Sequence, residues 1–325
     1  MARGLPEPRP SAWGGLTAIL DTPLKRGIAI AVLLAAMLVA PPLFGPYATV
    51  ILTNALLYTI LALGLNIVVG YAGLLDLGYA AFFAVGAYSV GILTTTFGWN
   101  FWATIPVAVL AAMVAGIIIG GPTLRLRSDY LAIVTLGFGE IVRIAARNLD
   151  ITGKASGISG IEQPWLFGWH IRTQTDFYYV FLVLAIVGIL VSVRLANSRL
   201  GRAWLYVRHD EDAAEAMGIN RVRVKLAAYI IGAIYGAIGG AFFAVNFTAI
   251  SPQSFSFQQS TLFLMAVILG GMGKIPGVIL GAFIVVLAPE VLRDFGSLRY
   301  LIFAVGLLLI MLYRPSGIWP AGARR

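Results

Sequence analysis

The stretch DEDAAEAMG, residues 210–218, lies at the centre of a charged loop, Arg194–Lys225, that separates two long apolar runs. Asp212 can cap the amino end of a short helix, and Glu215, three residues later, can complete a capping box. Gly218 is the residue type that ends a helix in a left-handed turn. A helix of about two turns is not stable alone in water, so we expect something outside the loop to hold it.

Two interpretations of this segment remain open. It is either a docking helix for a cytosolic partner or an amphipathic connector that lies on the membrane. Small side chains favour docking, and two flanking arginines are candidate ion-pair donors to the partner. The candidate docking residues are Arg208, Asp210, Asp212, Ala213, Ala214, Glu215, Gly218 and Arg221.

The composition is that of a membrane protein with many spans. Of 325 residues, 59% are hydrophobic and only 11% are charged, with a mean hydropathy of +0.89, whereas soluble domains are about 25% charged. The absence of cysteine excludes disulfides, thiolate nucleophiles and iron–sulfur ligation. His170 and His209 are the two histidines, which excludes a histidine-rich metal site.

We expect an all-α fold with about ten membrane spans, within a range of eight to ten, because a bilayer is crossed by about 20 apolar residues. Gly270–Gly277 interrupts the eighth and ninth spans, which could instead form a re-entrant pair. The expected spans are 27–44, 47–70, 75–97, 101–123, 129–147, 177–195, 226–249, 258–273, 276–292 and 298–313.

Ten spans place 17 lysines and arginines on one side and 6 on the other. The positive-inside rule then predicts that both termini and the central loop are cytosolic. The expected organisation is a cytosolic amino tail (1–26), a membrane domain (27–319) and a cytosolic carboxyl tail (320–325). The membrane domain would contain the cytosolic loop 196–225 and the outer loop 148–176.

The fifth span is unusually polar. Glu140 lies within it, where an ionised group costs about 2.5–3.5 kcal/mol, and Arg143 shares its helix face. An ion pair between them resolves that cost. The span is either a helix that lines a pathway or a packed helix with a structural ion pair. The candidate pathway residues are Asp129, Thr135, Gly137, Gly139, Glu140 and Arg143.

Several other sites are excluded or disfavoured. No phosphate-binding loop of the GxxxxGK[ST] type occurs, so the chain itself is expected to bind neither ATP nor any other cofactor. The acidic cluster of the central loop lacks a second carboxylate motif for a metal. Polar residues in apolar runs are expected to join helices rather than bind substrate: Asn54, Asn66, Asp76 and Asn246.

Two glycine-rich turns echo each other. Spans two and three meet at Gly70–Gly73, and spans eight and nine meet at Gly270–Gly277. Both pairs would turn near the cytosolic side, which suggests a duplicated half, although chance can produce this in a chain with 37 glycines. Small-residue spacing in span seven, from Gly232 to Gly240, predicts close helix packing.

These motifs resemble those of a known transporter family. Asp212-Ala213-Ala214 with Gly218 resembles the EAA-xxx-G loop of ABC importer permeases, with Asp in place of Glu. The chain from about residue 47 to 319 more closely resembles the LivM-type permease subunits of branched-chain amino-acid ABC importers. The segments that carry this likeness are 124–141, 151–158, the central loop, 269–281 and 313–318.

The resemblance implies a partner set and a substrate. It implies a second, LivH-type permease, two cytosolic ATPase subunits and a periplasmic or lipid-anchored binding protein. Lipid would surround the chain, and no nucleic acid would bind it. The cargo would be leucine, isoleucine or valine, although related permeases carry urea, short amides or other amino acids. A stand-alone secondary transporter and a membrane-embedded enzyme are the rival classes.

Overall fold

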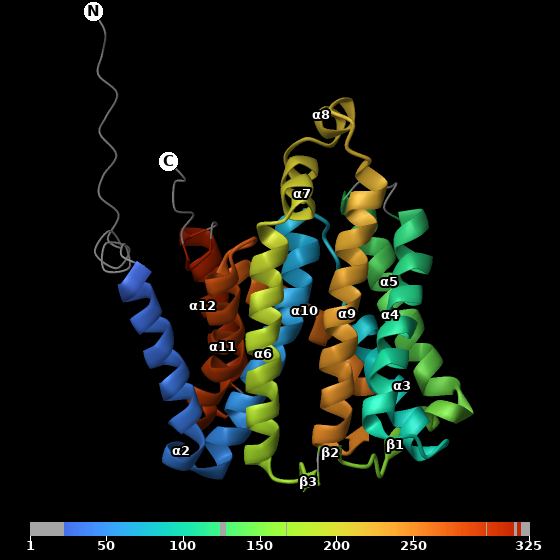
Figure 1. Ribbon diagram of the computed structural model, residues 1–325, viewed down its shortest axis with the longest axis vertical. Coiled ribbons are helices and arrows are strands. Elements are labelled where there is room, and N and C mark those ends of the chain that lie inside the picture. The colour runs from blue at the N-terminus through green and yellow to red at the C-terminus, as the bar shows by residue number, and fades with distance from the viewer. Residues whose placement is uncertain (1–22, 124–127, 167, 297, 315–316, 320–325) are drawn as a thin grey trace, which may run out of the picture. The chain divides into compact units, whose positions relative to one another are not determined.

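The computed structural model describes residues 23–123, 128–166, 168–296, 298–314 and 317–319. Their regular structure is almost entirely helical, which confirms the all-α class (Figure 1). The helices are α2 (Pro23–Leu65), η1 (Asn66–Tyr71), α3 (Ala80–Thr95), α4 (Phe101–Thr123), α5 (Ser128–Asn148), α6 (Gln174–Ala196), α7 (Arg199–His209), α8 (Glu211–Ala216), α9 (Arg221–Phe247), α10 (Phe257–Gly270), α11 (Ile275–Val291) and α12 (Leu298–Tyr313).

Short elements fill the connections. Two pairs of two-residue antiparallel strands occur, β1 (Ile158–Ser159) with β4 (Ala249–Ile250) and β2 (Trp165–Leu166) with β3 (Trp169–His170). Single turns of 3₁₀ helix are η2 (Asp150–Thr152), η3 (Lys154–Ser156), η4 (Pro252–Phe255) and η5 (Arg293–Phe295).

The chain divides into two compact units, residues 1–49 and 50–325. In the first unit, α2 continues through Pro41 and Pro42 and breaks at Gly45, whose φ of 77° is not helical. This break falls between the expected spans 27–44 and 47–70. A glycine at this position reaches a left-handed conformation that proline, with φ fixed near −65°, cannot adopt.

Four described helical segments are long and apolar enough to cross a bilayer: Ala35–Tyr71, Phe101–Thr123, Gln174–Ala196 and Arg221–Phe247. Four more apolar helices are shorter: Ala80–Thr95, Phe257–Gly270, Ile275–Val291 and Leu301–Ile310. The described chain therefore has the elements of a polytopic membrane protein. Helix α5 is in neither group because it carries charged residues along its length.

The helix that begins in α2 ends in an irregular break rather than in a simple turn. Residues 66–71 form a buried π-helix, η1, and residues 72–79 are not helical, so α3 starts only at Ala80. This start is later than the expected span 75–97. Gly73, with φ of 71°, lies in this break. A π-helical turn that follows an α-helix without a break often occurs at a functional site.

Helix α9 packs tightly against α3 because small residues face each other. A Cβ atom added at Gly240 would overlap the carbonyl oxygen of Phe83, and one at Gly86 would overlap that of Ala237. The rings of Phe82 and Tyr229 meet edge to face, with centroids 5.3 Å apart. The small-residue packing expected of span seven is confirmed.

The second unit has two distinct ends (Figure 1). Helix α8 lies at one end, and the strands β1 to β3 lie at the other. Helix α9 joins them, since its 27 residues extend about 40 Å at 1.5 Å per residue. The central loop and the loop 148–176 are therefore at opposite ends, as the alternation of spans predicts.

Candidate functional site

The central segment, Arg199–Lys225, comprises α7, α8 and the start of α9. Helix α8 begins with Asp210, whose Oδ1 accepts hydrogen bonds of 3.0 Å from the backbone N–H groups of Asp212 and Ala213. The predicted cap at Asp212 with a capping box from Glu215 is therefore wrong. The extended backbone of Asp210, with φ of −156° and ψ of 111°, points its carboxylate at these free N–H groups, as an N-cap requires.

The carboxyl end of α8 has the geometry of a Schellman motif. The N–H of Gly218 donates to the carbonyl of Glu215 at 2.9 Å, and the N–H of Ile219 donates to that of Ala214 at 3.0 Å. Gly218 has φ of 83°, a conformation that glycine adopts without strain. The prediction that Gly218 ends this helix is confirmed.

The acidic residues of α8 pair with the base of α9. Arg221 lies 3.2 Å from a carboxylate oxygen of Glu215 and 3.5 Å from one of Asp212. The Lys225 Nζ lies 2.6 Å from Glu211, and its side chain is only 3% exposed. A nearly buried lysine needs such a partner. Arg221, expected to pair with another subunit, therefore has its carboxylate partners within this chain.

The outer surface of α8 combines small side chains with acidic ones, since the side chain of Asp212 is 94% exposed. Ala213 and Ala216 are exposed, and Met217 is 83% exposed. Ala214 is instead buried against the chain, with 4% of its surface accessible. Sequence reasoning grouped Ala214 with the docking residues and did not select Met217. An exposed methionine suits an adaptable apolar contact.

Arg208 of α7 points into the second unit. Its Nη1 donates to the carbonyl oxygen of Gly70 in η1, and a Cβ at Gly73 would lie 2.8 Å from its Cγ. The neighbouring Trp204 is fully buried and stacks on Tyr71, with ring planes 6° apart. Arg208 is exposed apart from this contact, so its pairing with another subunit stays a prediction. Within this chain it joins the central segment to the helix break.

The two glycine-rich turns meet in space. The Asn66 Oδ1 accepts a 2.8 Å hydrogen bond from the backbone N–H of Gly273, 207 residues away along the chain. A Cβ at Gly70 would approach the same N–H group. The two glycine-rich turns that resemble each other in the sequence therefore touch each other in the structure. Arg208 lies beside both, since a Cβ at Gly273 would be 3.4 Å from its Nη1.

The non-helical segment 72–79 packs on α5. The N–H of Leu77 donates to the Thr135 hydroxyl at 3.1 Å, and the Cα of Gly78 lies 3.2 Å from the place of a Cβ on Gly139. Two of the predicted pathway residues, Thr135 and Gly139, therefore contact this break.

The other predicted pathway residues do not join them in one cluster. Glu140 and Arg143 form the expected ion pair at 2.6 Å, with about a quarter to a third of each side chain exposed (31% and 24%). Gly137 faces open space. The side chain of Asp129 is outside the described residues. The ion pair is therefore confirmed, and the pathway assignment of these residues stays a prediction.

Asp76, which is expected from the sequence to join helices, lies in the non-helical segment 72–79. It is completely buried; its Oδ1 accepts a 2.8 Å bond from the N–H of Gly78. Its Oδ2 has no hydrogen-bond partner of ordinary geometry among the described residues, although the hydroxyls of Thr135 and Tyr229 face the carboxylate. The sequence feature that distinguishes Asp76 is a carboxylate within an apolar run, because ionisable groups inside membrane segments are rare and usually mark a function.

Together these contacts form one connected network. Lys225 fastens α8 to α9, the Trp204 Nε1 donates to the Val224 carbonyl and so joins α7 to α9, and Arg208 joins α7 to η1. The network ends at the two helix breaks, deep among the long helices. Within a rigid bundle, such packed and hydrogen-bonded chains are how displacement at one end can change the other.

Comparison with known proteins gives a consistent result. Residues 47–312 match the protein family described as branched-chain amino acid transport system, permease component. The chain is 41% identical to the Escherichia coli K12 permease LivM, over 94% of this chain and 77% of that protein. It is 39% identical to the Salmonella typhimurium LivM with the same coverage, and 24% identical to the E. coli K12 permease LivH, over 80% of this chain and 90% of that protein. No solved structure matches.

Proposed function

Because the chain belongs to the family of permease components of branched-chain amino acid transport systems, we propose that it is one membrane subunit of an ATP-driven importer. Its cargo is leucine, isoleucine or valine, which it moves across the inner membrane. Both relatives of highest quoted identity carry the words branched-chain amino acid transport in their names. Related cargoes such as urea, short amides or other amino acids are the alternative.

The importer contains further subunits. A LivH-type permease pairs with this chain, as the similarity to a LivH protein suggests. Two cytosolic ATPase subunits supply energy, because this sequence has no phosphate-binding loop of its own. A binding protein outside the membrane delivers the amino acid. The chain itself is a permease rather than an enzyme and holds no cofactor.

The structural observation that best supports this proposal is how α8 is capped and attached to α9. A six-residue helix is too short to be stable alone, yet it is capped at both ends and fastened to α9 by Glu211–Lys225. Its exposed surface presents the small residues Ala213 and Ala216 and the side chain of Met217 beside the acidic Asp212. Such a helix can enter a cleft on an ATPase and transmit its movement through Arg208 to the helix breaks.

Replacement of Ala213 by tryptophan tests the docking of α8. Ala213 is exposed, so the larger side chain fits this chain but blocks a tight cleft. In the reconstituted complex, we expect ATP hydrolysis to lose its response to the loaded binding protein. Val187→Trp, at an exposed position in the middle of α6 and away from both ends of the unit, is the matched control. Full coupling and uptake in the assembled Ala213→Trp complex would refute the docking role.

A stand-alone transporter remains a distinct alternative with its own test. The isolated chain is reconstituted into vesicles with an ion gradient, and leucine uptake is measured. Uptake without the ATPases would sink the proposed function, since this bundle is proposed to have no energy source of its own. The complete complex serves as the positive control.

The proposed topology has ten spans with both termini, the amino tail 1–26 and the tail 320–325 in the cytosol. The membrane domain is 27–319, with the loop 196–225 inside and the loop 148–176 outside. The lack of cysteine in the sequence makes single-cysteine labelling clean. Met217→Cys should react with an impermeant reagent from the cytosolic side only; reaction from the outer side would reverse the topology.

A further inference from the structure

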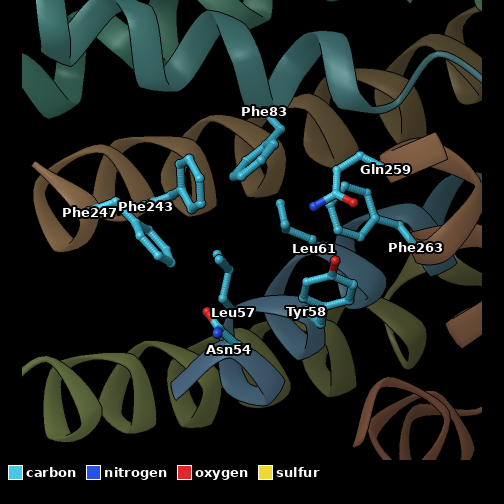
Figure 2. Close-up of a pocket in the computed structure, with 9 residues that line it drawn as sticks. All are labelled: Asn54, Leu57, Tyr58, Leu61, Phe83, Phe243, Phe247, Gln259 and Phe263. Carbon is cyan, nitrogen blue, oxygen red and sulfur yellow. The ribbon is translucent and has the colours of Figure 1, made fainter. Parts of the chain in front are cut away.

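A cavity of about 200 Å³ lies in the second unit between α2, α3, α9 and α10 (Figure 2). Its walls are hydrocarbon and aromatic: Leu57, Leu61, Phe83, Phe243 and Phe263. Leu61, Phe83 and Phe263 are almost completely buried. Close-packed interiors contain few spaces larger than a water molecule, so a hollow of this size between four helices has room for a small ligand.

The cavity is closed on one side by aromatic rings. The rings of Phe83 and Phe263 meet edge to face, with centroids 5.8 Å apart, and Tyr58 meets Phe263 at 5.1 Å. Behind this layer lies Tyr79, whose ring centroid is 6.3 Å from that of Phe263. Tyr79 is the last residue of the segment that joins the buried Asp76 to α3. The cavity is therefore separated from the helix break by one layer of aromatic side chains.

The cavity lies toward the end of the unit that is opposite α8. Phe243 and Phe247 are in the last turns of α9, about 33–39 Å along the helix from Arg221 at 1.5 Å per residue. Phe247 is 45% exposed and forms the outer part of the lining. A small molecule that arrives from the end opposite the central segment meets this cavity before it meets the helix breaks.

Polar groups occupy the edges of the cavity and leave its walls apolar. Asn54 lies at one edge in Figure 2, and the hydroxyl of Tyr58 and the amide of Gln259 lie at another. The Gln259 side chain hydrogen-bonds Tyr58. None of the lining residues is charged. An inorganic ion would find no countercharge here. An amino acid with an aliphatic side chain has no net charge, and it would find apolar walls for the side chain and neutral polar groups for the head.

We propose that this cavity is a transit site that holds the branched aliphatic side chain of the amino acid before it passes the aromatic layer. Cavities of about 150 Å³ with apolar walls bind benzene-sized molecules, so the measured volume has room for such a group. The neutral side chains of Asn54, Tyr58 and Gln259 would then hydrogen-bond the ammonium and carboxylate groups of the amino acid. This inference rests on the proposed function and adds a site within the membrane subunit.

Leu57→Phe tests the site by filling it. Uptake of leucine and of valine is measured separately in the complete reconstituted importer, each with a saturating amount of loaded binding protein. The ratio of the two maximal rates then reports on the membrane step. Because one methylene in an apolar pocket changes discrimination by about tenfold or more, we expect the leucine-to-valine ratio to fall about tenfold. Leu190→Phe, on the exposed face of α6, is the matched control and should leave the ratio unchanged.

A second change separates pocket filling from damage to the fold. Phe243→Ala enlarges the cavity from the opposite wall, so the double variant Leu57→Phe/Phe243→Ala should recover most of the leucine-to-valine ratio. An unchanged ratio in the assembled Leu57→Phe complex overturns the transit site, as does a loss that Phe243→Ala does not reverse. If Leu57→Phe fails to assemble, Phe243→Ala alone decides: it should favour the larger cargo, and an unaltered ratio overturns the site.

The proposed importer function and the proposed transit site are contradicted by different results. A wild-type complex that hydrolyses ATP but moves neither leucine nor valine contradicts the proposed function. A wild-type complex that moves both, with variants that keep its ratio, leaves that function intact and contradicts only the transit site.

Discussion

Arg208 is the residue whose removal should most directly uncouple the central segment from the helix breaks. Its guanidinium donates to the carbonyl oxygen of Gly70 in the π-helix, whereas part of the side chain remains exposed. A hydrogen bond from a charged donor contributes about 1.5–3 kcal/mol, and the exposure favours the low end because solvent screens the charge. Arg208→Ala should therefore weaken the link by about 1.5 kcal/mol, which is about a factor of ten.

The assay compares two rates in the same reconstituted importer. Leucine uptake and ATP hydrolysis are measured together, and the leucine moved per ATP hydrolysed is the quantity of interest. Arg208→Ala should lower it about tenfold while α8 still docks, so hydrolysis persists. The matched control is Arg202→Ala, on the same helix, since Arg202 donates to the carbonyl of Asn197, five residues away, at 3.1 Å. Equal losses in both variants, or none in Arg208→Ala, would refute the link.

Two further predictions concern stability. Asp210→Ala removes the cap of α8 and should destabilise this helix by about 1 kcal/mol. We expect hydrogen exchange at the Ala213 amide to become roughly fivefold faster. Exchange as slow as in the wild type would contradict the assigned cap. Gly240→Ala introduces a methyl group against the Phe83 carbonyl and should lower the unfolding temperature of the purified chain, whereas Gly137→Ala, with open space around it, should not. Similar unfolding temperatures for the two would argue against the tight contact between α3 and α9.

Local features of the structure follow from local sequence. The span 101–123 coincides with α4 because twenty or so apolar residues specify a helix by hydropathy and backbone hydrogen bonding alone. The end of α8 at Gly218 and the pair Glu140–Arg143 are likewise set by neighbours within a few residues. Even so, the sequence did not decide whether Asp210 or Asp212 caps the helix. The cap is the residue whose backbone is extended rather than helical, and both aspartates precede residues that form helices well.

Contacts between residues that are far apart in the chain could not be predicted from the sequence. The sequence by itself determined a helical membrane protein with a charged central loop, two glycine-rich turns and a polar fifth span. Only the tertiary structure decided that Asn66 reaches Gly273, that Arg208 turns inward to Gly70, and that a cavity remains beside Phe83. The physical reason is that hydropathy and capping act over one or two helical turns. Which helix faces which depends on how small residues and aromatic rings fit together across the whole bundle.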